Sequence, residues 1–346
     1  MRRFFADDSF WNTPIPADVT IDDDSARLLL LLQAIRPEGF WVNCEVFAIP
    51  VYEADASTPR RTVHKRFRLD GKLPYQQVVE DSRAWITPNH PMGHGPGFGQ
   101  DVPIPEFALA DPEGDHHLAI VDWERMLAWD MWAAQRRADG EWESCTGMVY
   151  RLDGSGVFDL TQFAGVHDGE SIHMYGPSRA PGVPAIAGLI MRDEILAGEI
   201  AHKLSFASAG VALQQFVHPP ACWTDGPVRG GFPEGATLQL DPHLDLDRLE
   251  LSPAGKIIAR AWQRYGAVCV DGCGGNVIYA EGRYAYPEAD WSGLLTPHDV
   301  ECLGYAHLRV VQMEHIIPHG DTRHVTAETD AEKIIARYLE LAGKNT

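Results

Sequence analysis

The sequence predicts an all-β or β-rich α+β fold, a β-sandwich or jelly-roll-like domain with a few peripheral helices. The first observation is the distribution of turn residues. The sequence contains 24 prolines and 32 glycines, which separate short apolar runs, as in many short strands joined by turns. The second is partial alternation of apolar and polar residues within those runs, which is typical of strands with one solvated face. Few segments show helical periodicity, and two packed sheets explain the whole pattern.

Eight segments are predicted as strands, because they are apolar or partly alternating and are bounded by turn residues. They are residues 41–50, 117–122, 126–132, 148–152, 202–207, 237–240, 267–270 and 277–280. The stretch from Pro88 to Pro105 is long and irregular. Since long loops in compact domains are often functional, we expect it to wall a cleft.

Four helices are predicted from capping signals. Residues 25–35 follow three aspartates, and residues 191–201 carry acidic residues in their first turn. Residues 252–265 have a serine cap and Pro253 at the first helical position. Residues 329–341 open with Thr329 and Glu332 in capping-box spacing.

The length of 346 residues is enough for a sizeable core. We expect a single domain over residues 1–346. The segment from about 288 to 346 is a possible C-terminal extension that ends in a helix.

The net charge of −20 predicts that the surface repels nucleic acid and anionic membranes. It also disfavours a polyanionic substrate unless basic residues gather at the site. The longest apolar run, residues 28–32, is far below the roughly 18–20 residues of a membrane helix. We therefore expect neither a nucleic-acid nor a membrane partner.

The first residues do not form a signal peptide, because Asp7 and Asp8 follow the short apolar start directly. We expect an extracellular protein if a leader has been removed, and a cytoplasmic protein otherwise. The six cysteines show no CxxC pair, so both free thiols and disulfides stay open.

Five segments resemble a largely uncharacterised family of actinobacterial-type proteins. They are FWNTPIP at residues 10–16, ADASTPR at 54–60, HLAIVD at 117–122, GVPAIAGLI at 182–190 and PEGATLQLDP at 233–242. The resemblance covers residues 10 to about 282. It implies a secreted, glycan-active protein, and it implies no set of catalytic residues.

Histidines are the richest chemical signal. His117 and His202 each begin a predicted strand, so their side chains can converge on a cleft. Imidazole titrates near neutrality and suits general acid–base catalysis. The alternative for each is a structural histidine held by hydrogen bonds.

A carboxylate beside an aromatic ring suggests a sugar subsite. Asp130 and Trp132 share one face of a predicted strand. We expect Asp130 to be catalytic, and Trp132 and Trp129 to bind substrate by stacking. A solvated strand residue is the other interpretation of Asp130.

Arg179 lies in a loop rich in proline and glycine, where a fixed guanidinium can bind a carboxylate or an oxyanion. Tyr175 and His173 precede it and are expected to contact the substrate. Arginine, tyrosine and histidine together suit β-elimination from a uronate, in which arginine neutralises the carboxylate.

The sequence contains no spacing diagnostic of a metal, since Pro91 and Gly93 keep His90 and His94 off a helix. We expect no metal and no cofactor. No GxSxG elbow or phosphate loop is present either.

The function predicted from these residues is cleavage of a polysaccharide or oligosaccharide. A glycoside hydrolase with histidine and carboxylate acid–base chemistry leads. A polysaccharide lyase and a non-catalytic glycan-binding protein are the alternatives.

Overall fold

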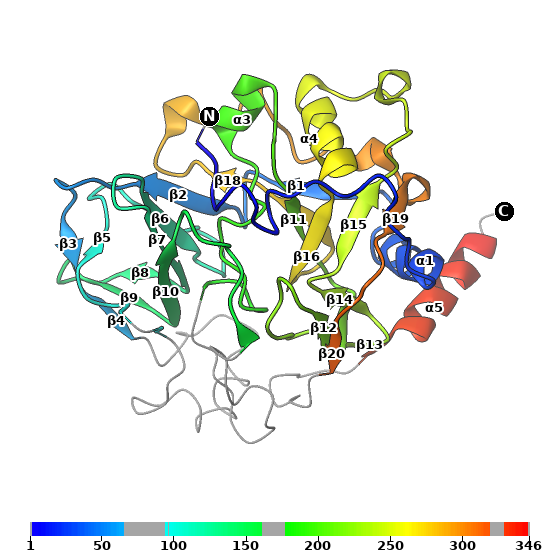
Figure 1. Ribbon diagram of the computed structural model, residues 1–346, viewed down its shortest axis with the longest axis horizontal. Helices are drawn as coiled ribbons and strands as arrows, with labels where there is room; N and C mark the ends of the chain where they lie inside the picture. The colour runs from blue at the N-terminus through cyan, green and yellow to red at the C-terminus, as the bar shows by residue number, and fades with distance from the viewer. Residues whose placement is uncertain (1, 66–93, 96, 161–176, 319–328, 345–346) are drawn as a thin grey trace.

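The computed structural model describes residues 2–65, 94–95, 97–160, 177–318 and 329–344. Strand exceeds helix in these residues, 29% against 19%, which confirms the β-rich prediction. A six-stranded sheet has the order β1-β17-β11-β16-β15-β19, and a five-stranded sheet has the order β10-β7-β6-β2-β18. Figure 1 shows the five-stranded sheet on the left and the six-stranded sheet on the right.

The strands are short, in keeping with the dense turn residues of the sequence. The six-stranded sheet contains β1 (Trp41–Asn43), β17 (Asn276–Tyr279), β11 (Leu204–Ser208), β16 (Ala267–Gly272), β15 (Thr237–Leu240) and β19 (Leu308–Val310). The five-stranded sheet contains β10 (Thr146–Arg151), β7 (Leu127–Trp132), β6 (Leu118–Asp122), β2 (Ile49–Glu53) and β18 (Glu281–Gly282). A separate sheet, also of five strands, is formed around β12 (Val211–Val217) by β13 (Val228–Arg229), β14 (Phe232–Glu234), β20 (Ile316–Pro318) and β21 (Thr329–Asp330). Two smaller sheets contain β3 (Arg60–Arg61) and β5 (Val102–Pro103), and β4 (Val63–Lys65), β8 (Gln135–Arg136) and β9 (Trp142–Ser144).

Both large sheets mix strand directions. β11 pairs parallel with β16 and antiparallel with β17, and β6 pairs parallel with β2 and antiparallel with β7. A jelly roll is built from antiparallel strands, so that part of the sequence prediction is not confirmed.

The two large sheets share one hydrophobic core, here called the inter-sheet layer. Its members from the five-stranded sheet include Ala119, Val121, Ala128 and Met148, and those from the six-stranded sheet include Ala207, Val268, Val270 and Tyr279. The opposite face of the five-stranded sheet packs into a separate core that contains Ile120 and Trp129. Because strand side chains alternate, the face on which a residue lies decides which core it enters.

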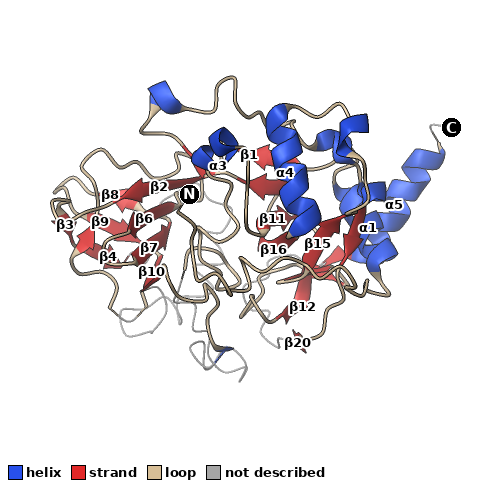
Figure 2. Ribbon diagram, turned by 45° about the horizontal axis from the view of Figure 1, so that its top comes forward, coloured by secondary structure: helices blue, strands red, loops and turns tan. Residues whose placement is uncertain are grey.

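All four predicted helices form. They are α1 (Ser25–Ile35), α3 (Arg192–Ala197), α4 (Pro253–Arg264) and α5 (Ala331–Gly343), with short 3-10 turns η2 (Leu246–Arg248), η3 (Pro287–Ala289), η4 (Glu301–Leu303) and η5 (Tyr305–His307). Ser252 caps α4, since its hydroxyl accepts the Gly255 N–H at 2.9 Å. The Trp262 indole donates to the Leu238 carbonyl of β15 at 2.9 Å, which holds α4 against the six-stranded sheet (Figure 2).

The segment after residue 288 contributes to the same sheets and cores. β19 is an edge strand of the six-stranded sheet, while β20 and β21 pair with β12 and β13. Ile335 of α5 packs with Leu31 of α1. Among the described helices, none has the length and apolar character needed to cross a bilayer.

Candidate active site between the two sheets

Asp130 of β7 is a buried anchor for the loop that carries Arg179. It pairs with Ala119 of β6, and its side chain is 0% exposed. Its Oδ1 accepts the Ser178 N–H at 3.1 Å, and its Oδ2 accepts the Ala185 N–H at 2.7 Å and the Tyr150 hydroxyl at 3.1 Å. The carboxylate therefore fastens both ends of the 178–185 loop, which corrects the expectation of an accessible catalytic acid beside a stacking ring.

Arg179 is buried, yet it uses only part of its hydrogen-bonding capacity. The residue is 1% exposed, and its Nη2 donates to the Ala185 carbonyl at 3.1 Å. Its guanidinium carbon lies 3.9 Å from the centre of the Tyr279 ring, and its Nη1 lies 4.0 Å from Asp271 Oδ2. Within the described part of the chain, Nε and Nη1 have no hydrogen-bond acceptor. Buried donors of this kind are rare unless a ligand or water completes them.

His117 enters the same region from the start of β6. It lies two residues before Ala119, so alternation turns its side chain toward the inter-sheet layer. The residue is 3% exposed, and its Nδ1 has no partner among the described residues. Burial lowers the pKa of His117 to about 4, with the charge of Asp115 opposing and that of Arg179 adding to the shift. The ring is therefore neutral at pH 7.

Three carboxylates complete the region. Asp225, Glu234 and Asp271 each place one oxygen within 4.8 Å of the others, and Glu234 Oε2 accepts the Asp225 N–H at 3.3 Å. Burial raises the pKa of Glu234 and that of Asp271 well above their usual range, and the charge of Asp225 adds to both shifts. Burial also raises the pKa of Asp225 to about 6.

A β-bulge turns Asp271 into this region. Along β11 and β16, Phe206 pairs with Cys269, but the next residue, Ala207, pairs with Asp271. Val270 is therefore an extra residue of β16 that has no partner in β11. A bulge of this kind re-aims the following side chain, and it places Asp271 on the face of Ala207, in the inter-sheet layer.

These residues form one site, here called the Arg179 site. Its members are His117, Asp130, Arg179, Asp225, Glu234, Asp271 and Tyr279. They come from both large sheets, the 178–185 loop, the turn before β13 and the end of β14. An anionic group can bind to the open N–H groups of Arg179, a proton can be accepted by neutral His117, and hard cations prefer carboxylate oxygens.

Comparison with protein-family models, with curated proteins and with solved structures gave no match to this chain. The chemistry of the Arg179 site therefore has to be argued from its own residues.

The aromatic residues expected to bind substrate separate onto two faces of β7. Trp129 is 6% exposed and packs in the core behind the five-stranded sheet, so alternation turns it away from Asp130, and the stacking role predicted for it is wrong. Trp132 is half-buried and shares the face of Asp130 by alternation. Tyr175 and His173 lie outside the described residues.

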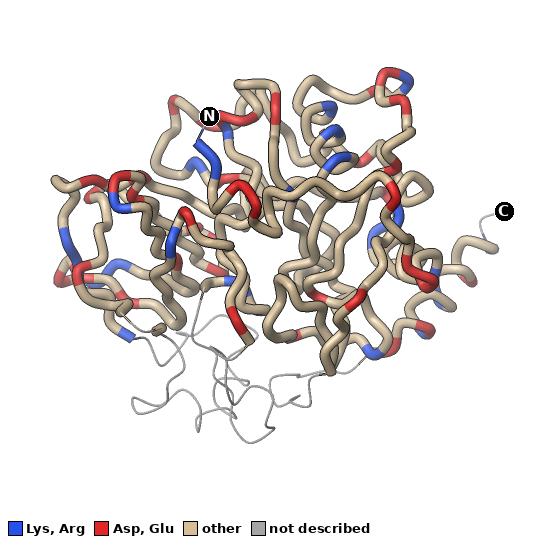
Figure 3. The backbone as a smooth tube through the Cα atoms, in the orientation of Figure 1, with Lys and Arg blue, Asp and Glu red and all other residues tan. Residues whose placement is uncertain are grey.

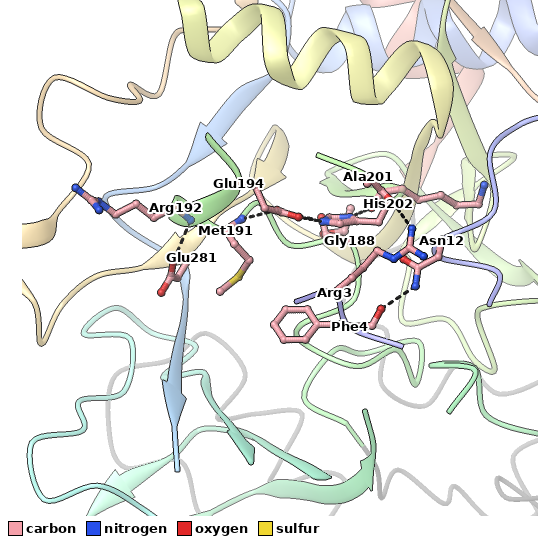
Figure 4. Close-up of polar contacts among 12 residues, drawn as sticks. Arg3, Phe4, Asn12, Gly188, Met191, Arg192, Glu194, Ala201, His202 and Glu281 are labelled. Atoms are coloured by element: carbon pink, nitrogen blue, oxygen red, sulfur yellow. Dashed lines mark hydrogen bonds and ion pairs between the residues drawn. The ribbon is translucent and has the colours of Figure 1, made fainter. Parts of the chain in front are cut away.

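The structure places His202 away from the Arg179 site. Ala207 is the β11 residue that pairs with Asp271, and His202 lies five residues earlier, on the order of 15 Å along an extended chain. Its Nε2 contacts Glu194 Oε1 at 3.0 Å, and its Nδ1 contacts the Lys203 carbonyl at 2.7 Å. Figure 4 shows His202 and Glu194 pointing toward one another. The prediction that His117 and His202 border one surface gains no support, because the partners of His202 are Glu194 and Lys203, and neither is a member of the Arg179 site.

We expect His202→Ala to lower stability without changing activity. Truncation leaves Glu194 buried without this partner, at a cost of about 1–3 kcal/mol. Burial lowers the pKa of His202, but the charge of Glu194 and its hydrogen bond outweigh burial and raise it overall. The stabilising contribution is therefore complete below about pH 6.5 and is lost as pH rises through the folded-state pKa.

Thermal unfolding of the wild type and of His202→Ala at pH 5.5 and pH 8.5 measures this contribution. The difference between their thermal midpoints should be larger at pH 5.5. Lost activity of His202→Ala with an unchanged thermal midpoint would instead show that His202 takes part in the reaction.

Sequence reasoning missed three members of the Arg179 site, namely Glu234, Asp271 and Tyr279. Acidic residues are spread along both halves of the chain (Figure 3), so charge alone does not single these out. Asp225 follows Trp223-Thr224 and precedes Gly226, a sequence that is also typical of a turn. The glycine-rich stretch after Asp271 is the one local signal of an unusual strand end.

A surface hollow elsewhere is lined by acidic residues that already have partners. Its volume is about 410 Å³, and its lining includes Glu53, Asp55, Glu106 and Phe107. Glu53 accepts from the Trp123 indole, Asp55 accepts from its own turn, and Glu106 pairs with Arg61 and Arg136. Because these acids are already engaged, the Arg179 site is the stronger candidate.

Proposed function

We propose that the protein is a carbohydrate-active enzyme that cleaves a glycan at the Arg179 site, by β-elimination next to a uronate carboxylate. The observation that carries the proposal is the buried guanidinium of Arg179, whose Nε and Nη1 have no hydrogen-bond acceptor among the described residues, within electrostatic range of a neutral His117. Nε–H and Nη1–H point from different edges of the guanidinium, so each can donate one charge-assisted hydrogen bond to an anionic oxygen. The sequence resemblance to glycan-active proteins supports the choice of substrate class.

The two residues have separate tasks in this reaction. Arg179 binds the uronate carboxylate and stabilises the charge that develops when the carbon next to it loses its proton. His117 accepts that proton at Nδ1, and the approach of an anionic substrate favours the protonated ring. The electron pair forms the C4–C5 double bond, the C4–O bond breaks, and the departing oxygen takes the proton that His117 has accepted, which restores the neutral ring.

Asp130 and Tyr279 are positioning residues. Asp130 fixes the backbone on both sides of Arg179, and the Tyr279 ring supports the guanidinium face. A buried side chain held on several sides keeps its geometry without reorganising during the reaction.

A glycoside hydrolase remains the second candidate, because the carboxyl groups of the site favour it. The raised pKa of Glu234 and that of Asp271 would keep a protonated acid available to the leaving oxygen. Excess negative charge would stabilise an oxocarbenium-like transition state. This chemistry suits a neutral glycan, whereas the open donors of Arg179 suit an acidic one.

The products separate the candidates. We expect incubation with uronate-containing polysaccharides to produce ultraviolet absorbance from the new C4–C5 double bond, at a rate that falls when the uronate is reduced to the neutral sugar. Reducing ends that form without this absorbance would indicate hydrolysis. Retention on an immobilised glycan with no product of either kind would indicate a binding protein.

A further inference from the structure

The carboxylates of the Arg179 site come from three separate segments. Asp225 lies in the turn after Trp223-Thr224, Glu234 ends β14, and Asp271 follows the bulge in β16. One oxygen of each lies within 4.8 Å of the others. No short sequence spacing encodes the cluster, so it is a product of the fold.

The charge of the cluster is unbalanced among the described residues. Three ionised carboxylates carry −3, and Arg179, whose Nη1 lies 4.0 Å from Asp271, contributes +1. The sum of −2 equals the charge that one divalent cation neutralises. Without such an ion, buried like charges at this separation repel and the groups retain protons instead.

Glu234 provides an observation independent of the clustering. Its side chain is 0% exposed, and in the described part of the chain its Oε1 has no hydrogen-bond donor. The other oxygen accepts the Asp225 N–H, so the carboxylate is held in place while Oε1 stays without a donor among the described residues. A buried, unsatisfied carboxylate oxygen requires a proton, water or cation.

The donor set selects the kind of ion. All three donors are carboxylate oxygens, which suit hard cations rather than zinc or copper. Two oxygens bound to Ca²⁺ at about 2.3–2.6 Å can lie up to about 5 Å apart, whereas two bound to Mg²⁺ at about 2.0–2.1 Å reach only about 4 Å. All three oxygens lie within 4.8 Å of one another, so they fit within the coordination sphere of Ca²⁺.

We propose that Asp225, Glu234 and Asp271 bind a divalent cation of the calcium type beside Arg179. Binding of the ion stands on the geometry alone. Its role rests on the proposed function, in which the cation and Arg179 together hold the uronate carboxylate. The proposal replaces the sequence expectation that no metal is present.

Terbium luminescence tests the proposal directly. Tb³⁺ occupies calcium sites, and Trp223 lies two residues before Asp225, close enough in the chain to transfer excitation energy to a bound ion. We expect excitation of the wild-type protein with Tb³⁺ to give sensitised emission that Ca²⁺ reverses. Asp271→Asn and Glu234→Gln should weaken Tb³⁺ binding at least about tenfold, because ligand charge sets the affinity of carboxylate sites.

Asp247→Asn is the matched control, since Asp247 is an exposed aspartate paired with Lys256, and it should bind Tb³⁺ like the wild type. Asp271→Asn keeps the test valid if Glu234→Gln does not fold, because the Asp271 side chain is 16% exposed and tolerates the isosteric change better. Equal Tb³⁺ emission from Asp271→Asn and the wild type, or emission that Ca²⁺ does not reverse, would overturn the proposal.

These measurements distinguish failure of the proposed cation site from failure of the proposed function. Tb³⁺ binding that Asp271→Asn abolishes, together with no glycan cleavage, rejects the function and keeps the cation site. Elimination that proceeds in EDTA, together with no specific Tb³⁺ binding, rejects the cation site and keeps the function.

Discussion

Replacement of Arg179 by lysine is expected to reduce glycan cleavage by about 10²–10³-fold in kcat/KM, the usual cost of losing a charge-stabilising donor. Lysine keeps the positive charge near Asp271, but it loses the rigid planar guanidinium with its fixed N–H directions. It also loses the stacking of the guanidinium on Tyr279. Initial rates of double-bond absorbance, measured with a uronate polysaccharide, give the ratio.

The matched control is Arg192→Lys, because the Arg192 guanidinium donates to the Asp290 carbonyl on the surface. That variant should cleave at the wild-type rate. A second readout is the preference for free over methyl-esterified uronate, which the wild type should show and Arg179→Lys should lose. Arg179→Lys activity within about threefold of the wild type, with the preference intact, would show that the guanidinium serves only the fold.

Local sequence signals were sufficient for the helices. The Ser252 cap and Pro253 fixed the start of α4, and three aspartates marked the start of α1. These signals act within one or two turns of the chain, so they do not depend on the rest of the structure. Most strand positions followed for a similar reason, since turn residues bound them, but residues 41–50 divide between β1 and β2, and β12 was not predicted.

The face on which a strand residue lies is a tertiary property, and here the sequence was less informative. Alternation placed Asp130 and Trp132 on one face of β7, but it did not show that both faces of the sheet are covered. The inter-sheet layer buries one face and a second core buries the other. Asp130 therefore became a loop anchor and Trp129 a core residue.

The acidic half of the Arg179 site could not have been predicted by spacing. Asp225, Glu234 and Asp271 lie on different segments, and the bulge opposite Phe206 and Ala207 reverses the side expected for Asp271. The placement of His202 failed for a related reason. A strand-opening residue lies at one end of the strand, and neighbouring elements decide which ends meet.

Asp130→Ala is expected to destabilise the protein by about 3–5 kcal/mol, because it leaves three buried donors without their acceptor. The Ser178 N–H, the Ala185 N–H and the Tyr150 hydroxyl all bind this carboxylate, and each unsatisfied buried group costs about 1–3 kcal/mol. Partial entry of water into the space left behind keeps the sum below the maximum. Denaturant unfolding monitored by tryptophan fluorescence measures the loss.

Asp130→Asn separates the charge of this residue from its shape. Burial raises the pKa of Asp130 to about 7, although hydrogen bonds from Ala185, Tyr150 and Ser178 oppose the shift. The folded protein therefore binds a proton that the unfolded chain releases near pH 4, so this carboxyl lowers stability progressively as pH rises from about 4 to 7. Asp130→Asn lacks that pH dependence, although its amide presents an N–H where an acceptor is needed.

The free energy of unfolding of the wild type minus that of Asp130→Asn should consequently fall between pH 4 and pH 7, measured in the same denaturant series. A difference that stays constant over this range would mean that Asp130 is ionised throughout as a salt-bridged carboxylate. In that case its negative charge, rather than its shape alone, would hold the Arg179 loop in place.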